Sequence, residues 1–249
     1  MLRNPADLPP IQKRPRLRPW LLAALVLLAG FVTARDIATQ HAPGCRFYRP
    51  ASGRLLIAHA AGGLSDRKYP NSIAALDRSY AHGLRYFEMD FHQLPFGVLR
   101  SGHDFTDVLD PRGAWISQVI AWMRSHPGTY LLPDMKTDNV AGLKQIAADA
   151  PDLKDRIIPF VYHQSQYEAV RALGFHLPIY ALFHDNRDAD WLAFANSHAF
   201  WAVAVAEEHI GQIPAVRHPV IVFTYDVMVK APGARAVITN CMVPAGPRS

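Results

Sequence analysis

The 249-residue sequence has few cysteines and, outside its first 35 residues, no excess charge of either sign. Its two cysteines, Cys45 and Cys241, are too few to indicate a metal site, but in an exported protein the two can form a disulfide. Residues 1–35 hold six Lys and Arg residues and one Asp, which accounts for the net charge of +5. The remaining 20 basic and 20 acidic residues balance, so we expect no basic surface and no nucleic-acid partner.

A hydrophobic run of 15 residues, Trp20–Ala34, comes after four cations at positions 13–18. The run is short for a membrane-spanning helix, which needs about 20 apolar residues and at least ~17. The preceding cations favour a cytoplasmic N-terminus and export of the chain beyond the run, and Ala34 is small enough for a signal peptidase. Residues 1–35 are predicted to be a signal peptide or, slightly favoured, an uncleaved membrane anchor. The rest of the chain is predicted to be periplasmic or otherwise extracytoplasmic.

Residues 36–54 have no sustained periodicity and contain Pro and Gly, which is typical of a linker. From Leu55 onward, apolar runs alternate with helical patterns. The runs cover residues 55–59, 86–90, 98–104, 130–136, 157–163, 179–185, 201–208 and 220–226, with 236–240 a possible ninth. Nearly continuous apolar runs are typical of parallel strands that are covered on both faces.

This alternation predicts βαβ units with right-handed crossovers. Eight units would close a TIM-type (β/α)8 barrel over residues 55–249. The seven residues 91–97 are too few for a parallel crossover. Either 98–104 is a hairpin arm and 236–240 completes the barrel, or this connection is a degenerate loop. A doubly wound sheet is the other α/β candidate, but no G-x-G-x-x-G comes after the first run.

Ionisable residues gather at the C-terminal ends of these runs, where TIM barrels have their active sites. Glu88 and Asp90 are two residues apart on one predicted strand and therefore share a face. Buried carboxylates need a compensating cation, and Asp134 ends a nearby run. We predict that these three bind a divalent metal; the alternative is a structural ion pair with Arg85 or Lys136.

His59 and His103 each end a short apolar run. Two histidines beside a carboxylate-bound metal provide the acid and the base that phosphodiester hydrolysis requires. Each could also be an ordinary core or loop histidine. Lys136 is two residues from Asp134, so it could bind a phosphate oxygen or simply pair with Asp134.

The order of these residues resembles the glycerophosphodiester phosphodiesterase family, the phospholipase C-like TIM-barrel phosphodiesterases. That family has, in order, His-Arg-Gly, Pro-Glu-Asn-Thr, Glu-x-Asp, His-Asp and Glu-Ile-Lys. The corresponding stretches here are HAA at 59–61, PNS at 70–72, EMD at 88–90, HD at 103–104 and DMK at 134–136. Residues 156–175 are also similar to the middle of a bacterial branch of this group.

The resemblance implies hydrolysis of a small-molecule or lipid-derived glycerophosphodiester, with Mg²⁺ or Ca²⁺ on Glu88, Asp90 and Asp134. In that family one histidine takes a proton from a substrate hydroxyl, which attacks phosphorus, and the other protonates the leaving alcohol. The resemblance also gives a substrate-binding role to Asn71, which by itself could be a helix cap. If uncleaved, the N-terminal helix would make the membrane a second partner.

Two departures from the family pattern affect the predicted site. Ala60 stands where the family has an arginine thought to bind phosphate, and Asp134 is one methylene shorter than the family's glutamate. We predict that Arg67, or less favourably Lys68, supplies the lost phosphate contact from the loop after the first strand. Lys136 is the competing candidate, and a solvated charge run is the alternative interpretation of the loop.

Two other functions remain open at this point. One is a phospholipase of the same superfamily that cleaves phospholipid headgroups, and the other is a catalytically silent barrel with a binding role, which the two departures favour. A disulfide between Cys45 and Cys241 is also predicted, because the first and last strands of a closed barrel are neighbours.

Overall fold

The computed structural model describes residues 53–67, 69–182, 190–206, 215–223 and 233–241. The predicted leader (residues 1–35), most of the predicted linker, and Lys68 lie outside these residues. Within the described ranges no helix has both the length and the apolar character that crossing a membrane requires. Cys241 is disulfide-bonded; Cys45, its predicted partner, lies outside the described residues, so this pairing stays a prediction.

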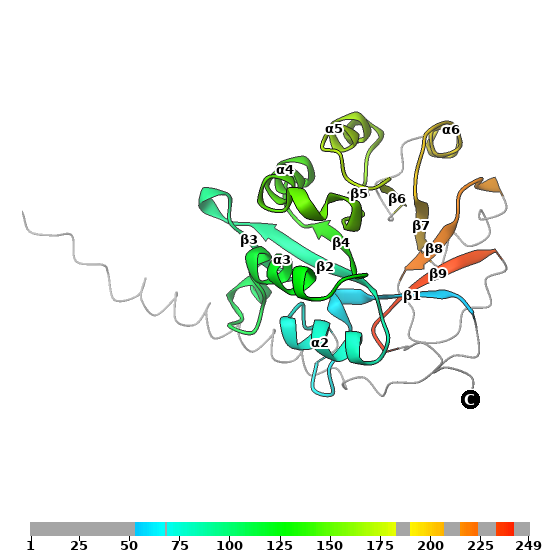
Figure 1. Ribbon diagram of the computed structural model, residues 1–249. Helices are drawn as coiled ribbons and strands as arrows, with labels where there is room; N and C mark the ends of the chain where they lie inside the picture. The colour runs from blue at the N-terminus through cyan, green and yellow to red at the C-terminus, as the bar shows by residue number, and fades with distance from the viewer. Residues whose placement is uncertain (1–52, 68, 183–189, 207–214, 224–232, 242–249) are drawn as a thin grey trace, which may run out of the picture. The chain divides into compact units, whose positions relative to one another are not determined.

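In the described part of the chain, parallel strands form one curled sheet (Figure 1). They are β1 Leu55–Ala58, β2 Tyr86–Gln93, β4 Tyr130–Met135, β5 Phe160–Val161, β6 Ile179–Leu182, β7 Ala202–Ala206, β8 Val220–Phe223 and β9 Ala234–Thr239. Parallel pairing runs from β5 through β6, β7, β8 and β9 to β1, β2 and β4. A parallel bridge between Leu131 in β4 and Ile157, just before β5, connects the last strand of this series to the first. The predicted α/β fold is therefore found as a TIM-like barrel.

The short link after β2 is a hairpin. Strand β3, Leu99–Ser101, pairs antiparallel with β2 instead of joining the ring of parallel strands. Of the two alternatives for residues 98–104, the structure has the hairpin arm, and β9 is the strand that completes the ring. The physical reason is that residues 91–97 cannot span the crossover which a parallel neighbour needs.

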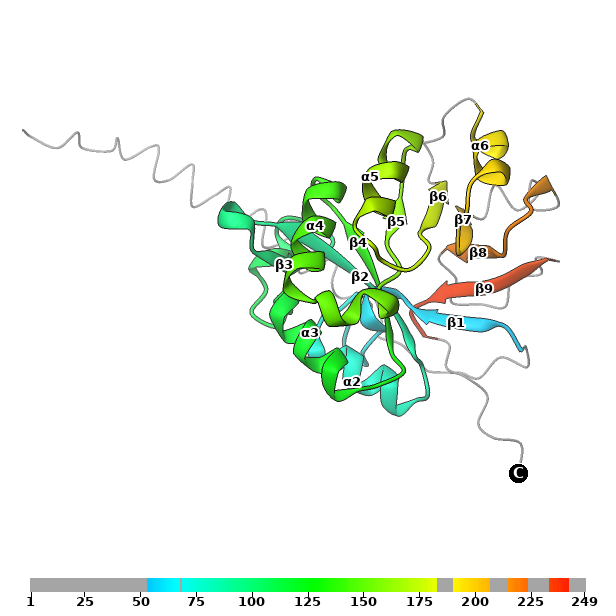
Figure 2. The ribbon, with the colours of Figure 1, turned by 45° about the horizontal axis from the view of Figure 1, so that its top comes forward.

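Helices cover the outer side of the sheet, as Figures 1 and 2 show. They are α2 Ile73–Ala81, α3 Ile116–Ser125, α4 Asn139–Asp149, α5 Tyr167–Ala172 and α6 Trp191–Ser197. Two have side-chain N-caps: Ser72 accepts the N–H of Ala75, and Asp138 accepts that of Ala141. The sequence offered Asn71 as a possible cap of α2, and the structure uses the next residue, Ser72.

Alternation along each strand divides the apolar core into two layers. Phe87 and Met89 of β2 pack with the helices in the outer layer. A second cluster consists of strand and strand-end residues alone and fills the barrel interior, with Ile57, Phe160 and Ile238 among its members. Glu88 and Asp90 alternate with the outer-layer residues, so their carboxylates face the interior.

Candidate metal centre

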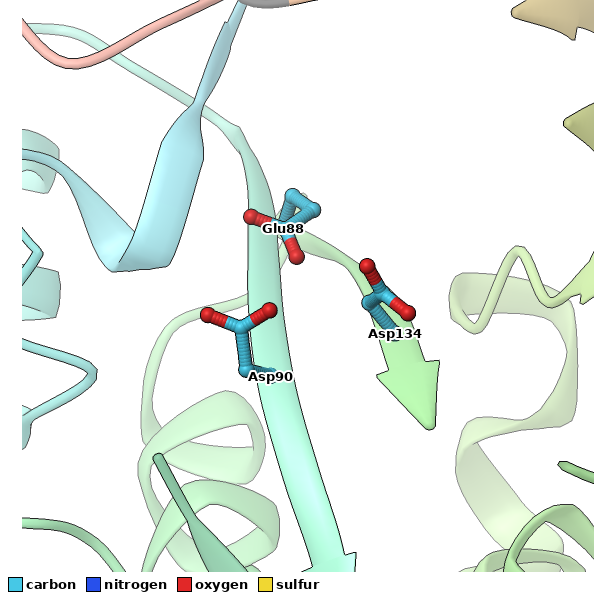
Figure 3. A group of neighbouring side chains, drawn as sticks. All are labelled: Glu88, Asp90 and Asp134. Carbon is cyan, nitrogen blue, oxygen red and sulfur yellow. The ribbon is translucent and has the colours of Figure 1, made fainter. Parts of the chain in front are cut away.

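Three buried carboxylates meet at the C-terminal end of the barrel interior. Glu88 and Asp90 come from β2 and Asp134 from β4, and Figure 3 shows their side chains pointing toward one another. Asp90 and Asp134 are direct partners in the parallel register. One oxygen from each of the three carboxylates lies within 4.8 Å of the others. This is the arrangement of hard oxygen ligands that Mg²⁺ and Ca²⁺ prefer.

Glu88 carries the strongest sign that a cation belongs here. Its Oε2 accepts the backbone N–H of Ala60 at 2.9 Å, whereas its buried Oε1 has no hydrogen-bond partner among the described residues. Burial, and then the charges of Asp90 and Asp134, raise the pKa of Glu88 well above its ordinary value. A divalent cation would supply both the missing partner and the missing charge, so the donor set fits such a metal.

Lys136 pairs with two of the carboxylates. Its Nζ lies 2.8 Å from Asp90 Oδ1 and 2.8 Å from Asp134 Oδ2, although only the second contact has hydrogen-bond geometry. Burial raises the pKa of Asp90, but the Lys136 ammonium, His59 and the Asn71 hydrogen bond together outweigh burial, and the pKa is lowered overall. One ammonium against three carboxylates leaves an excess of negative charge for a metal to balance.

Asn71 binds Asp90 rather than capping a helix. Its Nδ2 donates to Asp90 Oδ2 at 2.7 Å, and its Oδ1 accepts the Asp90 backbone N–H at 3.0 Å. The residue has a positive φ of 42°, a conformation that Asn tolerates better than most residues. The alternative interpretation of Asn71 as a helix cap is therefore wrong, and its side chain orients one of the three carboxylates.

His59 is held next to the carboxylates by Asn240, the residue just past β9. His59 Nδ1 donates to Asn240 Oδ1 at 2.8 Å, and His59 Nε2 lies 3.8 Å from Glu88 Oε2. Burial lowers the pKa of His59, against the opposing charge of Asp90. The ring is therefore neutral near pH 7 with its proton on Nδ1. The sequence did not indicate Asn240, because the pattern at the strand ends consists of ionisable residues and an amide does not stand out from it.

His103 lies beside the cluster but outside it. The preceding residue, Gly102, donates its backbone N–H to the Asp90 carbonyl at 3.1 Å, which places this segment next to β2. The His103 ring is more than half exposed, and its Nδ1 lies 3.0 Å from Asp104 Oδ1. Among the described residues, the backbone contact with Asp90 is thus made by Gly102, and the His103 imidazole contacts Asp104 and none of the three carboxylates.

Arg67 is buried in an ion pair with Asp110, whose Oδ2 lies 2.6 Å from Arg67 Nη2. It lines a cleft of about 330 Å³ between the loop after β1 and the segment before α3. None of the three carboxylates lines that cleft. Ala60, where the family has its arginine, is fully buried and contributes its backbone N–H to Glu88.

A further buried residue that the sequence did not indicate is Tyr162, directly after β5. Its hydroxyl donates to Asp134 Oδ1. Burial and the neighbouring Asp134 charge raise the pKa of Tyr162 well above its ordinary value, so the phenol keeps its proton. The signal was present in the apolar run 157–163, where Tyr162 is near the C-terminal end, but a tyrosine there is also an ordinary core residue.

Among the comparisons with known proteins, only the comparison with solved structures finds matches. No family model matches the sequence, and no curated protein matches it significantly. A glycerophosphodiester phosphodiesterase from Parabacteroides distasonis superposes with a TM-score of 0.59 at 15% identity, over 74% of this chain and 92% of its own. One from Thermotoga maritima has a TM-score of 0.56 at 12% identity, over 77% and 96%. The chain has the fold of the glycerophosphodiester phosphodiesterases.

A third structure of this fold is an Oleispira antarctica phosphodiesterase, solved with its product sn-glycerol-3-phosphate. It has a TM-score of 0.56 at 14% identity, over 78% of this chain and 93% of its own. At such identities the likeness concerns architecture. It confirms, for the fold, the resemblance that the order of the sequence motifs indicated. The matched structures are covered almost completely, so the likeness extends over their whole barrel.

Proposed function

We propose that the chain is a metal-dependent phosphoric diester hydrolase that converts a glycerophosphodiester into a phosphomonoester and an alcohol. The observation that carries the proposal is the buried cluster of Glu88, Asp90 and Asp134, in which Glu88 Oε1 lacks a partner among the described residues. A barrel fold by itself supports many chemistries. This cluster lies at the barrel end where such folds carry their active sites, and its donors suit a hard cation.

Glu88, Asp90 and Asp134 would hold Mg²⁺ or Ca²⁺, which when bound offsets negative charge on the reacting phosphoryl group. His59 is the proposed base. Asn240 occupies its Nδ1–H, and burial keeps the ring neutral, so Nε2 is available to take a proton from a substrate hydroxyl.

His103 is the proposed acid for the leaving alcohol. Its support is the order of the motifs and the contact between Gly102 and Asp90, which keeps its segment next to the cluster. The ring is exposed, and its contact within the described chain is with the adjacent Asp104, which is also exposed, so the ring can turn toward a substrate.

Lys136 is the proposed phosphate-binding residue, since its ammonium already lies among the carboxylates. Arg67 stays a weaker proposal, because its guanidinium would have to exchange Asp110 for the substrate. For residues 1–35 we keep the proposal of export, with the membrane as a partner if the leader is not cleaved.

The test is turnover by the full-length chain of glycerophosphocholine and of a chromogenic phosphodiester. Activity should disappear with a chelator, return with Mg²⁺ or Ca²⁺, and be absent in Glu88→Gln. If the wild-type chain binds either metal but turns over no phosphodiester, the silent-barrel alternative is correct and the proposed function is wrong.

A further inference from the structure

Tyr162 reaches the proposed metal centre from the neighbouring strand. The segment just before β5 lies beside β4, where Ile158 donates its N–H to the Leu131 carbonyl at 2.9 Å. Tyr162 is only 9% exposed and belongs to the interior cluster of the barrel. From there its hydroxyl donates to Asp134 Oδ1. A residue outside the five short motifs of the sequence thus binds one of the three carboxylates directly.

The backbone of Tyr162 is itself held in place. Its N–H donates to Gln166 Oε1 at 2.9 Å, and the same oxygen accepts from Asn139 Nδ2 at 3.3 Å. Asn139 Nδ2 also donates to the Phe160 carbonyl at 3.0 Å. These bonds tie the end of β5 to the first residue of α4, and the Phe160 ring stacks on that of Tyr162 with 6.1 Å between centroids. The phenol is therefore preorganised and does not have to be ordered when a ligand binds.

Asp134 receives one donor on each oxygen, Tyr162 on Oδ1 and Lys136 on Oδ2. Donors on both oxygens restrict the rotation of a carboxylate, but these two donors differ in charge. An ammonium competes with a metal ion for the negative charge of the carboxylate. A neutral phenol does not compete in this way, since it orients the oxygen while leaving its charge available.

We propose that Tyr162 is a positioning residue that holds the Asp134 carboxylate in the orientation from which it binds the divalent metal. This inference rests on the proposed function, in which Asp134 is the third metal ligand. Hydrogen-bond partners of metal ligands typically contribute about 10- to 100-fold to metal affinity. Orienting this carboxylate matters here because Asp has one methylene and one side-chain torsion fewer than Glu, and therefore fewer ways to bring a misplaced carboxylate back toward the metal.

The experiment compares Tyr162→Phe with Tyr180→Phe in the full-length chain. Tyr180, on β6, is a matched control because it is also buried, but it packs in the outer core, where its ring stacks on Phe200. The dissociation constants of Mg²⁺ and Ca²⁺ are measured by calorimetry, and the melting temperature is measured in a chelator. We expect Tyr162→Phe to raise the metal dissociation constant at least about tenfold, and Tyr180→Phe to leave it unchanged.

A double-mutant cycle isolates the contact with Asp134. In an Asp134→Ala background, Tyr162→Phe should have no further effect on metal affinity, because the acceptor is gone. Unchanged metal affinity in Tyr162→Phe would overturn the inference alone, and so would an equal loss in the Tyr180→Phe control. Failure of the wild-type chain to bind either metal would instead overturn the proposed function, and the inference with it.

Discussion

Asn71 and Asp90 bind each other through two hydrogen bonds, one to the carboxylate and one to the backbone N–H of Asp90. The pair joins the residue before the cap of α2 to the middle of β2. It fixes both the position of the strand and the orientation of the carboxylate, so a single amide couples the helix start to the metal centre. The adjacent residue, Ser72, caps the helix by accepting the Ala75 N–H and provides a comparison.

Asn71→Ala is expected to lower the free energy of unfolding by about 1–3 kcal/mol, because two buried groups of Asp90 lose their partner. The same change should weaken metal binding, since one of the three carboxylates is no longer oriented. Chemical denaturation and metal titration measure the two effects. Ser72→Ala should cost stability by loss of a helix cap, about 1 kcal/mol, with no change in metal affinity. An equal loss of affinity in both variants would contradict this prediction.

Asn240→Asp is expected to move the acidic limb of the pH–activity profile to higher pH. An aspartate at this position would stabilise the protonated imidazole and raise the pKa of His59, whose pKa burial lowers in the wild-type chain. Because the base must be neutral, activity then begins at a higher pH. The measurement is kcat/KM against pH, with Asn240→Ala as a control that removes the contact without adding charge. A limb that does not move in Asn240→Asp would exclude His59 as the titrating base.

Glu88→Gln should stabilise the chain in the presence of a chelator. The pKa of Glu88 is raised in the folded protein, so stability that is fully present below its unfolded-state pKa is lost as pH rises through the higher folded pKa. Glutamine does not titrate, and the gain near pH 8 should be about 1–3 kcal/mol. Melting curves from pH 4 to 8 test this. The wild-type chain should recover stability when Mg²⁺ or Ca²⁺ is added, and the variant should not. If the variant melts at a lower temperature than the wild-type chain at pH 8 in a chelator, the charge on Glu88 is not destabilising.

Lys136→Met is expected to destabilise the metal-free chain by about 3 kcal/mol, because Asp90 and Asp134 lose their cation in a buried site. Added metal should restore part of this loss, while the KM for a phosphodiester should rise if Lys136 binds phosphate. Arg124→Met removes an exposed ion pair with Asp152 and should change neither quantity appreciably. An unchanged KM with intact turnover would leave Lys136 as a purely structural cation.

The sequence alone determined the features that depend on local periodicity. Glu88 and Asp90 share a face because strand side chains alternate, and the structure has both facing the barrel interior. The apolar runs indicated the parallel strands. For residues 98–104 the short connection left two alternatives open, and only the structure showed the hairpin arm. The presence of Asp134 and Lys136 near these carboxylates was expected from their position at the end of another run and from the resemblance to a family.

Only the tertiary structure decided which side chains complete the site. His59 and Asn240 are 181 positions apart, and Tyr162 and Asp134 are 28 positions apart. Similarly, the pairing of Arg67 with Asp110 depends on how two loops meet, and no local pattern distinguishes it from a solvated charge run. Local sequence periodicity determines which face of a strand a side chain occupies. The residue that the side chain contacts depends on closure of the barrel, which brings β9 beside β1 and β5 beside β4.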